Sequence, residues 1–77
     1  MENEIVIKRF TEVRRDLGFT QAEFAQKLGI PSTTADIERG RTRLTGKVVT
    51  ELLRLYRINP LWLYGESNKR YLDTDSV

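Results

Sequence analysis

The stretch that decides the fold runs from Gly18 to Gly40 and reads GFTQAEFAQKLGIPSTTADIERG. Thr20 precedes Glu23 by three residues, which is the spacing of a capping box, where a hydroxyl and a carboxylate each accept a backbone N–H at a helix start. Apolar residues then recur at helical spacing: Phe24, Ala25 and Leu28. Gly29 follows where a left-handed backbone commonly ends a helix. These signals predict a short helix between Thr20 and Gly29, with its apolar residues in the core.

A second helix start follows at Pro31 and Ser32. The pattern predicts a helix of about two turns from Thr33 to Arg39, ended by Gly40. Two short helices joined by a glycine turn form a helix-turn-helix unit, which presents its second helix to the major groove of DNA.

Composition limits the classes of protein that fit. The chain has 77 residues, no cysteine and no histidine, so we expect one domain without disulfides, without thiolate metal sites and without the commonest general base. We therefore expect no enzyme, no cofactor and no metal. The N-terminus, MENEIVIKRF, is acidic, and the sequence holds no run of 18 apolar residues, so we expect a soluble cytoplasmic protein that is not bound to a membrane.

Positive charge is concentrated in one region although the net charge is only +2. Between Arg39 and Arg57 there are six cations and one acid, a local balance of +6 − 1 = +5. The last twelve residues, 66–77, carry two cations and three acids, or +2 − 3 = −1. The basic region indicates a nucleic-acid partner, and the alternative is an ordinary solvated face.

Three further helices complete an all-α scaffold. Apolar residues at spacings of four, three and four predict a helix over residues 4–17: Val6, Phe10, Val13 and Leu17. Thr45 can cap a helix that ends near Arg57, and Asn59 can cap a short one before Gly65, with Trp62 in the core. The sequence thus predicts five helices in a domain of residues 1–65, followed by a polar tail of residues 66–77.

From Phe10 to Gly65 the chain resembles the phage repressor and Cro-like helix-turn-helix family. The resemblance rests on LGFTQAEFAQKLGI, IERGR and NPLWLYGE, which occur in that order at nearly the family's spacing. It implies a compact five-helix, lambda-repressor-like domain with the helix-turn-helix at helices 2 and 3. Such domains read operators in double-stranded DNA, usually as symmetric dimers.

The resemblance also implies roles for individual residues. Thr20 and Gln21 match the start of the family's second helix, whose N-terminus points at a phosphate. The family's phosphate clamp is matched by Arg41, Arg43 and Lys47. Arg39 either joins that clamp or pairs with an acid near the turn, such as Glu38.

The second helix of the unit departs from the family pattern. Ten residues separate Gly29 from Gly40, where the family usually has eleven, and a deletion of one residue rotates all downstream positions by about 100° about the helix axis. Three explanations stay open: Thr34 is buried with Ile37, the helix is distorted at Asp36, or one residue is missing from the sequence itself. Aligned from the N-terminal side, the predicted base-reading residues are Ser32, Thr33 and Asp36, with Thr34 near a phosphate. Ser32 can alternatively act as an N-cap.

We therefore predict a DNA-binding transcriptional regulator, a repressor that binds a two-fold symmetric operator as a homodimer. Leu61 and Tyr64, in the last predicted helix, are the expected dimer contacts. One alternative is an antitoxin that binds DNA and engages a toxin protein through its tail. Another is a protein-interaction module that has lost DNA binding, which the shortened second helix and Asp36 would favour.

Overall fold

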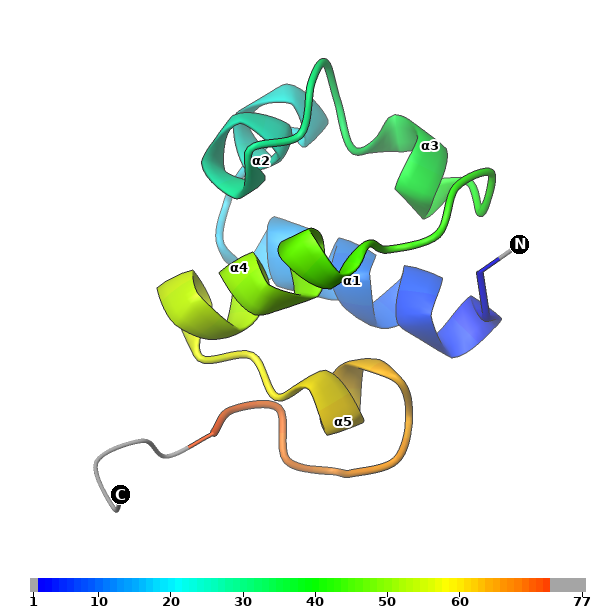
Figure 1. The fold of residues 1–77 in the computed structure, drawn as a ribbon, viewed down its shortest axis with the longest axis vertical. Coiled ribbons are helices and arrows are strands. Elements are labelled where there is room, and N and C mark those ends of the chain that lie inside the picture. The colour runs from blue at the N-terminus through cyan, green and yellow to red at the C-terminus, as the bar shows by residue number, and fades with distance from the viewer. Residues whose placement is uncertain (1, 73–77) are drawn as a thin grey trace.

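The computed structural model describes residues 2–72, and these residues form five helices (Figure 1). The helices are α1 (Glu4–Asp16), α2 (Gln21–Leu28), α3 (Ala35–Glu38), α4 (Gly46–Tyr56) and α5 (Pro60–Leu63). Extended pairing within the described part is limited to one antiparallel bridge between Ile58 and Tyr71. The predicted all-α fold is confirmed. None of the helices in residues 2–72 has the length and apolar character needed to cross a bilayer.

Side-chain caps start four of these helices. Thr20 and Glu23 form the complete capping box that the sequence predicted, with Thr20 Oγ1 accepting from Glu23 N at 3.1 Å. Thr45 and Asn59 cap α4 and α5 as expected. Asn3 caps α1 by accepting from Ile5 N at 2.9 Å, a cap that the sequence analysis did not identify. Each cap satisfies an N–H that the helix itself leaves unpaired.

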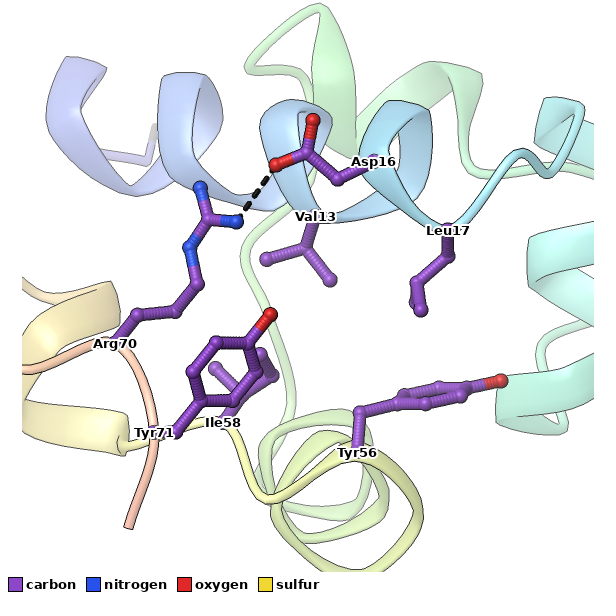
Figure 2. A pocket seen from close by; sticks show the side chains of 7 residues that line it. All are labelled: Val13, Asp16, Leu17, Tyr56, Ile58, Arg70 and Tyr71. Atoms are coloured by element: carbon purple, nitrogen blue, oxygen red, sulfur yellow. Dashed lines mark hydrogen bonds and ion pairs between the residues drawn. The ribbon is translucent and has the colours of Figure 1, made fainter.

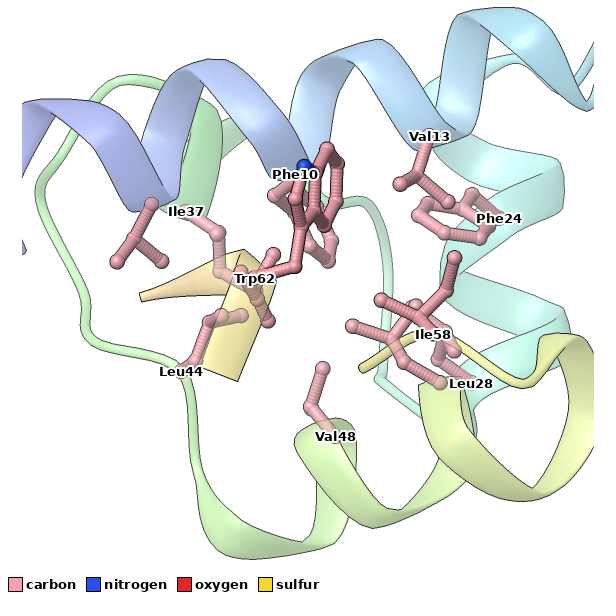
Figure 3. Close-up of a cluster of buried hydrophobic side chains, with 12 residues drawn as sticks. Phe10, Val13, Phe24, Leu28, Ile37, Leu44, Val48, Ile58 and Trp62 are labelled. Atoms are coloured by element: carbon pink, nitrogen blue, oxygen red, sulfur yellow. The ribbon is translucent and has the colours of Figure 1, made fainter. Parts of the chain in front are cut away.

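The core forms where α1 meets the other helices (Figure 3). Phe10 of α1 packs on Phe24 of α2, with ring centroids 5.2 Å apart. Phe19 and Tyr56 extend this aromatic cluster towards α4. Leu17, the last residue of the predicted α1 stripe, is 39% exposed because it caps the end of the helix, beyond the packed turns.

Residues 66–72, the first part of the predicted polar tail, fold back against the helices. Arg70 donates to Asp16 of α1 at 2.6 Å and lies 4.8 Å from the centre of the Trp62 ring. Leu72 N donates to Arg57 O at 2.9 Å, on one side of the bridge. We call residues 66–72 the C-terminal strap. The rest of the predicted polar tail, residues 73–77, lies outside the described residues.

Trp62 links the strap to the core, and its substitution tests this packing. Trp62 is 6% exposed and lies against two guanidinium groups, those of Arg9 and Arg70. We expect Trp62→Ala to lower the free energy of unfolding by about 3–5 kcal/mol, since a large buried side chain leaves a cavity. Denaturant unfolding measures this loss. Leu61→Ala is the control, because Leu61 is 59% exposed, and an equal loss in both variants would contradict the assignment.

Candidate nucleic-acid interface

The helix-turn-helix unit lies at one end of the domain, and α5 lies at the other (Figure 1). Gly29 ends α2 in the left-handed conformation, with φ of 73°. Residues 30–34 then form an irregular segment before α3 begins. The unit therefore consists of a regular helix, a longer connection than expected and a very short second helix.

The predicted start of α3 at Thr33 is wrong, because the helix spans only Ala35–Glu38. Ser32 has a positive φ of 71° and lies outside the helix, so it is not the N-cap. Thr33 Oγ1 instead accepts a hydrogen bond from Ala35 N at 3.1 Å. The side chains of Ser32, Thr33 and Asp36 are exposed. These three predicted base-reading residues therefore lie at the surface, two in the connection and one in the helix.

Thr34 is the residue that explains the shortened helix. Its side chain is fully buried, and Ile37 is also buried. The first of the three explanations for the missing position therefore holds: Thr34 packs inward with Ile37. The predicted phosphate contact of Thr34 is wrong, because its hydroxyl donates to Glu38 Oε2 at 2.5 Å and has no access to solvent.

Glu38 is the centre of a hydrogen-bonded network that connects α1, α2 and α3. Arg14 of α1 makes a bidentate contact with it, Nε to Oε2 at 2.8 Å and Nη2 to Oε1 at 3.0 Å. Gln21 Nε2 donates to Oε1 at 3.3 Å, and Thr34 adds the fourth bond. The side chains of Arg14 and Glu38 are only 13% and 7% exposed. Such a bidentate, largely buried pair fixes geometry as well as charge.

The same network sets the ionisation of Glu38. Burial alone would raise the pKa of this carboxyl group, but hydrogen bonds from Arg14, Thr34 and Gln21, together with the positive charge of Arg14, hold the pKa below its ordinary value of 4.5. Glu38 is therefore ionised at neutral pH and supplies the negative charge that Arg14 requires.

Four predicted phosphate-binding cations follow α3 in the chain. The side chains of Arg39, Arg41, Arg43 and Lys47 are all exposed. Within residues 2–72, none of them forms an ion pair. The alternative in which Arg39 pairs with Glu38 is therefore not realised, because Glu38 is taken by Arg14.

The segment that carries these arginines is held at both ends. Arg41 N and Thr42 N donate to Asp36 O at 2.8 and 3.3 Å, so the segment turns back against α3. Further on, Leu44 N donates to Glu2 Oε2 at 2.9 Å. We call residues 39–47 the basic segment. Its backbone is fixed by these bonds, while its cationic side chains point to solvent.

Thr20 and Gln21 lie at the N-terminus of α2, as predicted. Thr20 is exposed and acts in the capping box, which also lowers the pKa of Glu23, chiefly through the backbone N–H of Thr20. Gln21 is half-buried, because its amide reaches Glu38. Both residues stay near the positive end of the α2 dipole, where an anion is favoured.

Leu61 and Tyr64, the expected dimer contacts, are exposed on and just after α5. Their exposed fractions are 59% and 40%. The helix α5 itself lies at the end of the domain away from the helix-turn-helix unit (Figure 1). Within the described residues, no cluster of acidic side chains is arranged to hold a metal ion.

Sequence reasoning missed Arg14 and Glu2 as supports of this face. Arg14 lies 24 residues from Glu38, and Glu2 lies 42 residues from Leu44. No local spacing pattern connects such distant residues. The one usable signal was the pair of polar residues Thr34 and Glu38 at a spacing of four, which places them on the same side of a helical turn.

The Glu38 network predicts a specific loss of stability in acid. Because the pKa of Glu38 is lower in the folded than in the unfolded chain, its contribution is complete above pH 4.5 and is lost as the pH falls through the folded-state pKa. We expect Glu38→Gln to be less stable at pH 7 and to show a smaller further loss between pH 5 and about pH 3. Urea unfolding across this range measures both effects.

Glu51→Gln is the control for that experiment, because Glu51 forms a more exposed pair with Arg54 on α4. It should keep the acid dependence of the original chain. If the Glu38 and Glu51 variants lose acid dependence equally, the network does not carry it.

Comparison with known proteins agrees with this geometry. A family model described as helix-turn-helix matches residues 11–63, more than half of the chain, including α2, α3 and the basic segment. A search of curated proteins and a search of solved structures found no match. The family match supports a DNA-binding transcriptional regulator in general. The chain therefore belongs to the helix-turn-helix family, in agreement with its resemblance to Cro-like regulators.

Proposed function

We propose that this protein is a repressor that binds a two-fold symmetric operator as a homodimer. The observation that carries the proposal is the set of four exposed cations without ion-pair partners in residues 2–72, which lie at the end of α3, in the loop after it and in the first turn of α4. A small domain bound at an operator blocks access to the DNA that it covers, which is how a repressor acts. As a DNA-binding regulator it would act in the cytoplasm.

Phosphate contacts supply the affinity in this proposal. Arg39, Arg41, Arg43 and Lys47 neutralise phosphates and release counterions. The N-terminus of α2, with Thr20 and Gln21, adds backbone N–H donors for one more phosphate. Because these contacts read no bases, they fix the position of the domain without selecting a sequence.

Base reading falls to the short side chains on and before α3. Thr33 and Ser32 can bond several base edges, and Asp36 can accept from cytosine N4. None of them offers the bidentate guanine contact of arginine. We therefore expect modest selectivity from a single domain, with the second half-site of a dimer adding the rest.

Loss of one phosphate contact has a defined salt signature. We expect Arg41→Ala to weaken binding to all duplexes alike and to lower the slope of log K against log salt by about 1. Fluorescence anisotropy with a labelled duplex over a salt series measures the slope. Arg54→Ala, in which the lost cation pairs with Glu51 on α4, should leave it unchanged. An unchanged slope for Arg41→Ala would remove Arg41 from the interface.

Base reading by Thr33 has a different signature. Once an operator has been selected from a random duplex library, Thr33→Ala should weaken operator binding by about 1–3 kcal/mol and leave binding to random DNA nearly unchanged. Competition binding compares the two. Equal losses on both DNAs would mean that Thr33 contacts only the backbone.

The dimer in this proposal forms through Leu61 and Tyr64. A two-fold contact at α5 would place two recognition units about 34 Å apart, one turn of DNA. We expect Tyr64→Glu to remain folded and to sediment as a monomer, because a charge is costly in a small apolar contact. Leu55→Glu is the control, since Leu55 is similarly exposed, at 38%, but lies on α4. A Tyr64→Glu protein that still sediments as a dimer would refute this interface.

A protein-interaction module is the second candidate, favoured by one observation. The single-turn α3 offers less surface to a major groove than a two-turn helix, and it carries an acid, Asp36. The same salt series separates the candidates. A regulator binds duplex DNA with a steep salt dependence, whereas an interaction module does not bind it at low salt.

A further inference from the structure

A small cavity opens between the last turn of α1, the end of α4 and the C-terminal strap (Figure 2). Its volume is about 130 Å³. Val13 of α1 and Leu17, which follows α1, form one side, and Tyr56, Ile58 and Tyr71 form the opposite side. None of the residues that line the cavity is among those assigned above to the DNA or dimer contacts.

We propose that this cavity is a binding site for one uncharged, single-ring aromatic molecule. Its size is the first argument, because an apolar protein cavity of about 150 Å³ takes up benzene. Its chemistry is the second. Of the seven lining side chains three are aliphatic and two are tyrosine rings, and the Asp16–Arg70 ion pair completes the lining. Aromatic rings favour offset or edge-to-face contact with another ring.

The charged groups at the rim exclude an anionic ring. Arg70 is already committed, since it donates to Asp16 Oδ2 at 2.6 Å and to Glu12 Oε2 at 3.4 Å. These three groups carry one positive and two negative charges. A carboxylate on the ligand would therefore meet net negative charge, whereas a hydroxyl can bond to the ion pair without a charge penalty.

Binding in this cavity would also fix the strap. Tyr71, one of the aromatic walls, belongs to a segment held to residues 57–59 by two backbone hydrogen bonds, Asn59 N to Arg70 O at 2.7 Å and Leu72 N to Arg57 O at 2.9 Å. A ring placed between Tyr71 and α1 adds contacts to both sides. The ligand should therefore slow hydrogen exchange at the Leu72 amide.

Benzyl alcohol is the probe for the test, and cyclohexylmethanol and benzoate are its matched comparisons. Titration of the ¹⁵N-labelled chain should give saturable shifts at Val13, Leu17, Ile58 and Tyr71. Cyclohexylmethanol should bind several-fold more weakly than benzyl alcohol, because its saturated ring lacks the aromatic contact. Benzoate should also bind more weakly than benzyl alcohol, because of its negative charge. Hydrogen exchange at the Leu72 amide should slow with the same dependence on benzyl alcohol concentration as the shifts.

Two variants locate the binding in the cavity. Leu17→Phe places extra volume inside it and should weaken benzyl alcohol at least tenfold, whereas Leu55→Phe makes the same change at a leucine of nearly equal exposure outside the cavity and should not. Tyr71→Ala removes a wall that is 55% exposed, so the chain stays folded and binding is lost. The Leu17 and Tyr71 variants together distinguish a loss of binding caused by a change in the cavity from a loss caused by failure to fold.

Several results would overturn the proposal. Shifts that never saturate, or equal weakening by Leu17→Phe and Leu55→Phe, would mean that no site exists. Tighter binding of benzoate would mean an anion site at Arg70. Shifts at the cavity residues that appear on raising the protein concentration without any probe would mean that a second copy of the chain fills it. None of these measurements uses DNA, so their failure is independent of the proposed function.

Discussion

The buried carboxylate of Glu38 joins the segments on which the helix-turn-helix unit depends. Arg14 from α1, Gln21 from α2 and Thr34 from the connection all donate to it. Removal of one partner from such a pair is strongly destabilising, by about 3–5 kcal/mol, because an unpaired charge stays buried. Replacement of the whole network by apolar side chains of similar volume need not destabilise the fold. The pair therefore acts chiefly by fixing where α3 lies relative to α1.

This constraint accounts for the unusual α3. Four residues make too few backbone hydrogen bonds to hold a helix alone. Burial of Thr34 and Ile37, together with the Glu38 bonds, supplies the missing support. The basic segment follows because Arg41 N bonds back to the carbonyl of Asp36 within the same turn. The position of the cations is thus set by a largely buried ion pair.

Local signals in the sequence predicted most of the fold. The capping box at Thr20 and the caps at Thr45 and Asn59 each act within three residues, so they can be read directly. The length of α3 could not be predicted, because it depends on Thr34 turning inward to a carboxylate held by Arg14. The fold of the strap could not be predicted either, because Arg70 is held by Asp16 and Glu12, which lie 54 and 58 positions earlier in the chain. For the site, the sequence predicted where in the chain the cations are concentrated. Tertiary contacts determine which residues around them are exposed, as the buried Thr34 shows.

The most direct test of this account is a map of where DNA contacts the chain. Amide shifts of the ¹⁵N-labelled protein can be followed as a short duplex is added at low salt. We expect the changes to cluster at the N-terminus of α2, at residues 31–33 and along the basic segment, and to leave the cavity residues unmoved. Changes confined to α5 and the C-terminal strap, or no change at all with duplex in excess, would contradict it.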